Sequence, residues 1–359
     1  MNYRATTLFA LKNYTAAAVE LIPINLSDPI SRLLIRLQLY NNGSGSTTAH
    51  PAKAMKLIEL TDGSDVLFSL NGMEAYALNF FQNGKLPSDW LMYLDNNYLN
   101  IFFLLDFGRW LWDPDLALDP KRFNNLQLKI DMDESLGGVA PDASTMQVEA
   151  LCFDQKAVTP SGFLSSRKIK EYTMGSASHE YTELPTDKKI RKLIIKALLA
   201  GTELDQTMDH AKLSEDNDKH VVFDHTVHML GLLYPEENQE IHEHCYAQSN
   251  TSAVNIHCTP SNRVAGVVNA WQAAAGSYHT FYDGDGGLAH IIGGASNPVN
   301  ILMRGFGPNG CVCVPMGDQY DPNDWYDPSG LKSLRLDLLS KAAGSTYAAQ
   351  ILLQQLRLY

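Results

Sequence analysis

The chain has 359 residues, of which 45% are hydrophobic and 19% are charged, and its formal net charge at pH 7 is −12. This length is too great for one β domain and suits two, and the acidic balance argues against direct, sequence-specific nucleic-acid binding. The sequence shows no apolar run of membrane-spanning length and no signal-peptide pattern after Met1.

Five cysteines are spread over the chain without the spacing of a disulfide framework. An odd number of them favours buried thiols and synthesis in a reducing compartment. The full set is Cys152, Cys245, Cys258, Cys311 and Cys313.

The first half of the chain is expected to be mainly β-structure. Residues 1–27 have no clean period and are interpreted as an N-terminal arm, with a short helix over Tyr14–Ile22 as the alternative. Asn71 opens a run with helical spacing that ends near Gly84. The stretch 88–98 fits neither pattern clearly. Apolar runs predict strands at 30–40, 55–60, 66–70, 100–107, 123–130 and 144–152.

The second half is expected to begin after a connector. Residues 159–184 are polar and irregular, and they are interpreted as that connector, so that a second unit occupies 185–359. The run 190–199 suits a helix by propensity, but its match to residues 30–37 favours a strand. Residues 220–232 predict one or two strands.

A long stretch inside the second unit has the composition of a loop. Residues 235–305 are rich in Gly, Asn, Ser and Thr. Long loops of this kind usually carry function or contacts. We therefore predict a loop insertion here, with a short helix over Val264–Ala275.

The two halves repeat one another in the same order. Residues 30–37 match 190–197 at an offset of 160, and a frame of two Asp-Pro pairs followed by alternating apolar residues returns at an offset of 208. The growing offset places an insertion in the second copy. This pattern indicates internal duplication of an all-β unit. The Asp-Pro pairs are Asp113-Pro114, Asp119-Pro120, Asp321-Pro322 and Asp327-Pro328.

Histidines are concentrated in the second half and raise the question of a metal site. His242 and His244, two positions apart on an expected strand, could share one ion. Gln248 stands where a glutamate ligand would be needed, and the sequence names no third ligand. We favour a polar loop whose histidines make hydrogen bonds. Further members of the cluster are His220, His225, His228, His257, His279 and His290.

Two groups of aspartates invite a calcium interpretation. Asp283–Gly287 resembles the start of a calcium loop but lacks the later acidic ligands of an EF-hand, which favours a tight turn. A second group recurs every three residues, and its place in the duplicated frame favours turn formation over calcium binding. It consists of Asp318, Asp321, Asp324 and Asp327.

The sequence contains no nucleophile elbow, Walker loop or dinucleotide fingerprint. We therefore assign no catalytic, cofactor-binding or metal residue, and expect neither enzymatic activity nor a cofactor. Four basic residues on matching strands could face nucleic acid or lipid head groups, but an exposed face or salt bridges are favoured. They are Arg32, Arg36, Lys192 and Lys196.

The tandem of two all-β units resembles the double jelly-roll major capsid proteins of icosahedral viruses, such as tectiviruses, corticoviruses and other membrane-containing bacteriophages. The ordered duplication is the strongest part of the resemblance, which covers residue 28 to the end. The motifs that carry it are Phe107-Gly108-Arg109 before Asp113-Pro114, Leu118-Asp119-Pro120 before Phe123–Ile130, the run Asn71–Tyr76, and Asp216–Lys219.

This resemblance implies two tandem jelly rolls, at 28–158 and 185–359, with 235–305 as an outward tower and the arm near an inner membrane. It implies a structural capsid protein that forms pseudo-hexagonal homotrimers, made in the host cytoplasm and located in the virion. Its implied partners are neighbouring capsomers, vertex or minor capsid proteins and an internal lipid membrane.

Two other classes of function stay open. A carbohydrate-binding or carbohydrate-cleaving β-sandwich would stack sugars on tryptophans, although Trp112 and Trp325 lie in corresponding turns, which favours packing. A cupin-like metalloenzyme would use His242 and His244. Neither class needs the duplication. The tryptophans are Trp90, Trp110, Trp112, Trp271 and Trp325.

Overall fold

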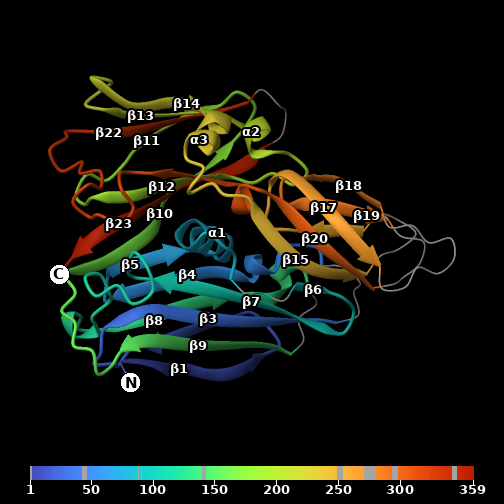
Figure 1. Ribbon diagram of the computed structural model, residues 1–359, viewed down its shortest axis with the longest axis horizontal. Coiled ribbons are helices and arrows are strands. Elements are labelled where there is room, and N and C mark those ends of the chain that lie inside the picture. The colour runs from blue at the N-terminus through green and yellow to red at the C-terminus, as the bar shows by residue number, and fades with distance from the viewer. Residues whose placement is uncertain are drawn as a thin grey trace.

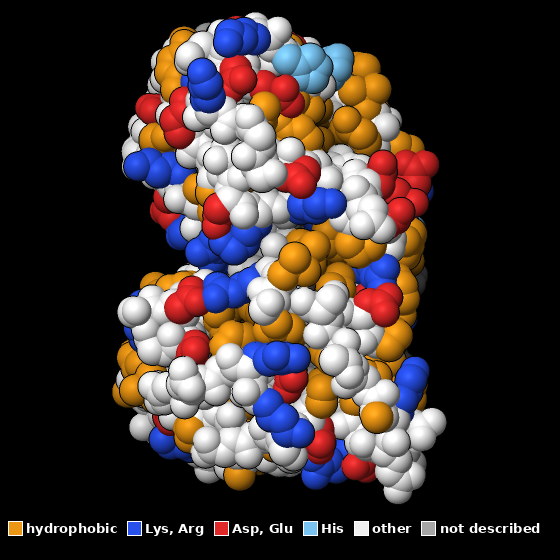
Figure 2. Space-filling model, turned by 90° about the vertical axis from the view of Figure 1, so that its left-hand side faces the viewer, with side chains coloured by type: hydrophobic (Ala, Val, Ile, Leu, Met, Phe, Trp, Pro, Cys, Tyr) orange, Lys and Arg blue, Asp and Glu red, His pale blue; other side chains and the backbone are white. Residues whose placement is uncertain are grey.

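A computed structural model describes residues 2–42, 47–87, 89, 91–139, 143–248, 254–270, 280–292, 298–341 and 346–359. Figure 1 shows two β units stacked on one another, with a third β region at one side. Figure 2 shows the same two units as separate lobes with a notch between them.

The first unit is a jelly roll of eight strands. Its two four-stranded sheets have the orders β1-β9-β3-β7 and β2-β8-β4-β5, and their inner faces share one hydrophobic core. This alternation of the chain between two antiparallel sheets defines the jelly-roll topology. The strands are β1 (Tyr3–Tyr14), β2 (Ala18–Pro23), β3 (Ile30–Asn41), β4 (Met55–Asp62), β5 (Asp65–Leu70), β7 (Asn97–Asp106), β8 (Leu126–Met132) and β9 (Ser144–Phe153).

The second unit repeats this topology strand for strand. Its sheets have the orders β10-β23-β12-β21 and β11-β22-β13-β14. The expected fold, two tandem jelly rolls arising by duplication, is confirmed. The strands are β10 (Gly162–Met174), β11 (His179–Glu183), β12 (Ile190–Ala197), β13 (Met208–Glu215), β14 (His220–Thr226), β21 (Cys311–Pro315), β22 (Leu334–Ser340) and β23 (Tyr347–Leu358).

The two jelly rolls are joined edge to edge. β5 of the first pairs in parallel with β10 of the second through the bridge between Ser69 and Arg167. One sheet of eight strands, β2-β8-β4-β5-β10-β23-β12-β21, therefore runs through both units.

The predicted domain boundaries need correction at the start of each unit. Residues 1–27 are not an unpaired arm or a helix, because β1 pairs with β9 and β2 pairs with β8. Residues 159–184 are not a connector, because β10 and β11 pair with β23 and β22. β1 lies at a sheet edge and β10 lies between the units, and the burial of these two strands does not alternate regularly. Without alternation the sequence gives no clear strand signal.

The helix predicted from Asn71 is confirmed as α1 (Gly72–Asn83). Asn71 forms a capping box with Glu74, and Gly84 ends the helix in the left-handed conformation. The prediction of strands over 220–232 is only partly correct, because β14 is followed by a helix that Thr226 caps. The remaining helical segments are α2 (Leu204–Thr207), α3 (Val227–Leu233), η1 (Pro51–Ala54), η2 (Pro120–Arg122), η3 (Glu134–Gly137) and η4 (Pro308–Gly310).

The insertion between β14 and β21 is folded, which corrects the prediction of a long loop. Two sheets, β17-β20-β15-β6 and β16-β19-β18, include most of its described part. The helix predicted over 264–275 is a strand as far as Ala270, and residues 271–275 lie outside the described residues. The strands are β15 (Ile241–Gln248), β16 (Val254–His257), β17 (Asn262–Ala270), β18 (Thr280–Asp285), β19 (Leu288–Ile292) and β20 (Pro298–Phe306).

One strand of the first half completes the insertion. β6 (Leu91–Tyr93) pairs in parallel with β15, with Leu91 opposite Cys245. β6 comes from the connection between β5 and β7, which corresponds to the connection between β14 and β21 that holds the insertion. The corresponding connections of the two jelly rolls therefore meet.

Candidate functional site

The candidate site is the junction where the two jelly rolls and the insertion meet around α1, which lies between the two units in Figure 1. Residues 72–81 of α1 are all buried. A helix buried on every side is expected to be apolar all round. Ala75 to Phe81 is apolar except for Asn79, whose side chain hydrogen-bonds the backbone of Leu104. Gly72 is required at the start, because a Cβ there would lie 2.0 Å from the carbonyl oxygen of Ala52.

Polar contacts tie α1 to the second jelly roll. The Asn309 side-chain amide donates to the carbonyl oxygen of Met73 over 3.0 Å. Glu74 lies 3.7 Å from the Lys168 ammonium of β10. These contacts fix the helix against both units.

The sheet β10-β23-β12-β21 is buried on both faces. On one face Leu193 and Ile195 contribute to the core of the second jelly roll. On the other face Ile194 and Leu352 belong to the core of the first. The first core thus extends through the junction to the second unit, which makes the junction a hydrophobic interface rather than a hinge.

A buried ion pair lies at another part of the junction. The Arg109 guanidinium donates to Asp113 over 2.6 Å and to the carbonyl oxygen of Tyr320 over 2.8 Å. Burial alone would raise the pKa of Asp113, but the hydrogen bonds from Arg109 bring it below its ordinary value. Arg109 therefore connects the Asp-Pro turns of the two copies.

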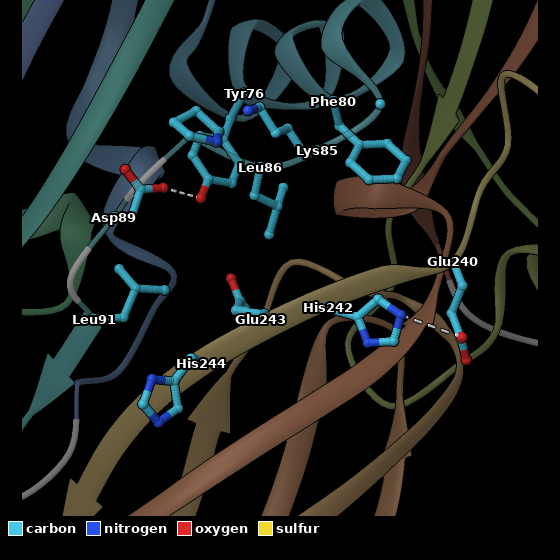
Figure 3. A pocket seen from close by; sticks show the side chains of 12 residues that line it. Tyr76, Phe80, Lys85, Leu86, Asp89, Leu91, Glu240, His242, Glu243 and His244 are labelled. Atoms are coloured by element: carbon cyan, nitrogen blue, oxygen red, sulfur yellow. Dashed lines mark hydrogen bonds and ion pairs between the residues drawn. The ribbon is translucent and has the colours of Figure 1, made fainter.

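A cavity of about 260 Å³ opens between α1, the segment that follows it and β15 (Figure 3). The Tyr76 hydroxyl donates to Asp89, which also accepts from the Phe102 backbone N–H over 2.9 Å. Across the cavity, Glu243 accepts from the Thr259 hydroxyl over 2.5 Å and from its backbone N–H over 2.9 Å.

Burial shifts the titration of these groups. It raises the pKa of Glu243 to about 7, against the hydrogen bonds from Thr259. Burial likewise raises the pKa of Asp89 well above its ordinary value, and it lowers the pKa of His50, which contacts Thr259 at 3.2 Å, to about 3. Glu243 is thus the group of this cavity whose pKa lies near neutral pH, and Tyr76 and Asp89 form a hydrogen-bonded pair across from it.

The predicted histidine pair also lines this cavity (Figure 3). His242 and His244 are exposed on β15, whereas Glu243 between them is buried (Figure 3). His242 pairs with Glu240 at 3.4 Å, and His244 with Asn300. Among the residues that the structure describes, no group of three or more His, Cys, Asp or Glu side chains could hold a metal ion.

The aspartates of the duplicated frame are turn formers, as predicted. Asp318 and Asp321 each accept from a backbone N–H two residues later, over 2.9 Å. Asp119 does the same for Lys121 over 3.1 Å in the first copy. Such contacts fix a turn locally. Gly286 and Gly287 form the tight turn between β18 and β19, both with positive φ.

Two of the described tryptophans, Trp112 and Trp325, pack against other groups of the protein. Trp325 is buried and donates to the carbonyl oxygen of Asp318 over 2.7 Å. Trp112 stacks on Tyr3 with ring centroids 4.1 Å apart. Trp110 is exposed, and Trp90 and Trp271 lie outside the described residues. Trp112 and Trp325 therefore have the packing role that their corresponding positions favour.

The structure gives protein partners to three of the four basic residues on matching strands and buries the fourth. Arg32 pairs with Asp106, and Arg36 donates to Asn100 over 3.4 Å. Lys192 is buried and pairs with Glu237. Lys196 is also buried. The salt-bridge alternative holds for two of them, and the exposed-face alternative is wrong for both lysines.

Sequence analysis missed the buried acids of the cavity. Glu243 occupies an inward position of an alternating strand, between the buried residues Ile241 and Cys245. An acid at an inward position is a signal that the pattern contains. Asp89 carries no such signal, because it belongs to the stretch that fits neither periodicity.

No described helix is both long and apolar enough to cross a membrane. No family model matches the sequence, and no curated protein matches it.

Solved structures match almost the whole chain. The major capsid protein of Sulfolobus turreted icosahedral virus has a TM-score of 0.62 at 11% identity, covering 99% of this chain and 97% of that one. The major capsid protein P2 of bacteriophage PM2 has a TM-score of 0.56 at 11% identity, covering 99% and 98%. VP54 of the virus PBCV-1 has a TM-score of 0.55 at 12% identity, covering 98% and 94%. This chain has the double jelly-roll fold that these capsid proteins share.

Proposed function

We propose that this chain is the major capsid protein of an icosahedral virus and that three copies form a pseudo-hexagonal capsomer. The observation that carries the proposal is the pair of jelly rolls with identical strand order in one chain, matched from end to end by capsid proteins. Three chains with two similar units each present six similar flanks, which suits the tiling of a closed shell.

The junction supports this role, because a shell subunit must hold its two units at a fixed angle. The continuous eight-stranded sheet, the shared core and the buried α1 all oppose relative motion. We therefore infer a structural, non-enzymatic role in the virion.

The insertion suits a projection from the shell. It forms its own β region at one side of the stacked jelly rolls in Figure 1. We infer that this region is a tower on the outer surface. Neighbouring capsomers, vertex or minor capsid proteins and an internal membrane are the partners that a capsid of a membrane-containing phage would supply, after synthesis in the host cytoplasm.

The native mass of the purified protein tests the proposal directly. Light scattering should give three times the chain mass of 39.8 kDa, and electron microscopy of the same sample should show hexagonal outlines. A monomer at every protein concentration would contradict the capsomer.

A further inference from the structure

We propose that α3 and the free edge of β14 in one copy dock on the free edge of β1 in a second copy. This contact would repeat, between copies, the one that α1 and β5 make with β10 inside the chain. The inference rests on the proposed capsomer and names the surfaces that hold it together.

The contact inside the chain serves as the template. The β5–β10 bridge joins Ser69 to Arg167. Beside it, the Ser165 hydroxyl donates to the carbonyl oxygen of Leu67 over 2.6 Å. Glu74 of α1 meets Lys168 of β10 as described above. Strand edge and helix together cover one side of β10.

The second jelly roll carries the same strand and helix at an offset of 155. Asn71 caps α1 and Thr226 caps α3, and Ser69 of β5 corresponds to Asp224 of β14. β14 is the last strand of its sheet, whereas β5 is an interior strand of the eight-stranded sheet. The edge of β14 therefore lacks the strand partner that its counterpart has.

The two helices differ sharply in exposure. Glu74, Ala77 and Leu78 of α1 are 1%, 1% and 4% exposed. Their counterparts Met229, Leu232 and Leu233 of α3 are 41%, 53% and 45% exposed. Three large apolar side chains on one exposed helix mark an interaction surface. The helix of the second unit that corresponds to the buried α1 therefore has an exposed apolar face.

The register of the sheets identifies the matching edge. Thr6 and Leu33 both pair with Ala150 in the first unit. Arg167 and Leu193 both pair with Leu353 in the second. Because Leu33 corresponds to Leu193 in the duplication, Thr6 of β1 corresponds to Arg167 of β10.

The bridge between copies would therefore join Thr6 to Asp224. β1 is the edge strand of its sheet, and Arg4 and Thr7 are exposed on it. Arg4 lies on the same side of β1 as Thr6, so its positive charge would lie near Asp224. The two strand edges are complementary at this contact, and Arg4, which pairs with Asp28 at 2.6 Å in its own chain, adds a positive charge beside Asp224.

The geometry of one chain excludes this contact within a single copy. β1 and β14 lie at opposite ends of the stacked units in Figure 1. A contact between different surfaces of successive copies is head-to-tail, and such contacts generate closed rings when the rotation between copies permits.

Cysteine crosslinking tests the register. In the double variant T6C/D224C, parallel bridge partners lie within reach of a disulfide, and the five native cysteines are buried. Mild oxidation should produce covalent dimers and trimers on a non-reducing gel. The control L21C/D224C, which moves one thiol to an exposed position on β2, should remain a single chain.

A charge placed on α3 tests the helix contact. Leu232→Glu should convert the trimer to a monomer in light scattering, with an unchanged circular dichroism spectrum because the side chain is exposed. Val267→Glu, at an equally exposed site on β17, should leave the trimer intact.

The outcomes separate the two proposals. A wild-type protein that is always monomeric contradicts the capsomer itself. A wild-type trimer that gives no T6C/D224C crosslink and survives Leu232→Glu overturns this interface and leaves the capsomer standing.

Discussion

The two jelly rolls share one topology but bury matching strands differently. In β3 burial alternates, with Leu33 and Ile35 inside and Leu34 half-exposed between them. In β12 every residue from Ile190 to Ala197 is buried. The outer face of β12 packs on the first core, whereas the outer face of β3 is covered only in part. Duplication thus preserved the scaffold, while position in the chain decided which face became interior.

The connections between the fifth and sixth strands differ even more. In the first unit this connection holds α1 and β6, and in the second it holds α3 and the insertion. Because β6 completes a sheet of the insertion, the enlarged connection of one unit is anchored by the short connection of the other. A duplicated unit can therefore add a large projection without losing the strands that define its fold.

The largest expected effect distinguishes the two copies of one strand. Ile194→Ala should lower the free energy of unfolding by about 2–5 kcal/mol, because the side chain is buried in the core that spans the junction. Leu34→Ala at the matching position should cost only about 1 kcal/mol, since Leu34 is half-exposed. Urea unfolding of both variants measures the difference. Equal losses would show that the second face of β12 contributes no more than the outer face of β3.

The next effect concerns the cavity where the two connections meet. The pKa of Glu243 is raised from 4.5 to about 7 in the folded protein. Below pH 4.5 the Glu243 carboxyl is neutral in both the folded and the unfolded protein, so it does not change the free energy of unfolding. Between pH 4.5 and 7 the unfolded chain ionises this carboxyl while the folded protein keeps it protonated, so stability falls by about 3 kcal/mol over this range and levels off above pH 7.

Glu243→Gln should remove this loss, because the amide stays neutral. Urea unfolding of both proteins between pH 4.5 and 8 measures the effect: the wild type should lose stability relative to the variant as the pH rises. Glu240→Gln is the control, because Glu240 directly precedes β15 and its side chain is partly exposed. Parallel pH profiles of wild type and Glu243→Gln would refute the assignment.

The smallest effect compares the helix caps. Asn71→Ala removes a capping box and should destabilise the protein by about 1–2 kcal/mol. Thr226→Ala removes a single 3.2 Å hydrogen bond to the Met229 N–H and should cost about 0.5–1 kcal/mol. Thermal unfolding of the two variants measures how much stability each helix cap contributes. A larger loss at Thr226 would mean that α3, not α1, is the more tightly coupled to the fold.

The sequence by itself determined the duplication, the turns before certain strands and the two ends of α1. Alternation around Leu128 and Leu336, the Asp turns before them, and the caps at Asn71 and Gly84 depend on neighbours along the chain, so periodicity and turn chemistry revealed them. They are sufficient to predict an all-β tandem.

Only the tertiary structure decided where each jelly roll begins, how the insertion folds and which acids are buried. β1 and β10 take their form from strands more than a hundred residues away, β9 and β23, and β6 exists as a strand beside β15. Glu243 became a proton-binding group because α1 and Thr259 exclude water from it. Non-local pairing and burial depend on the whole fold, and for this reason local patterns did not contain them.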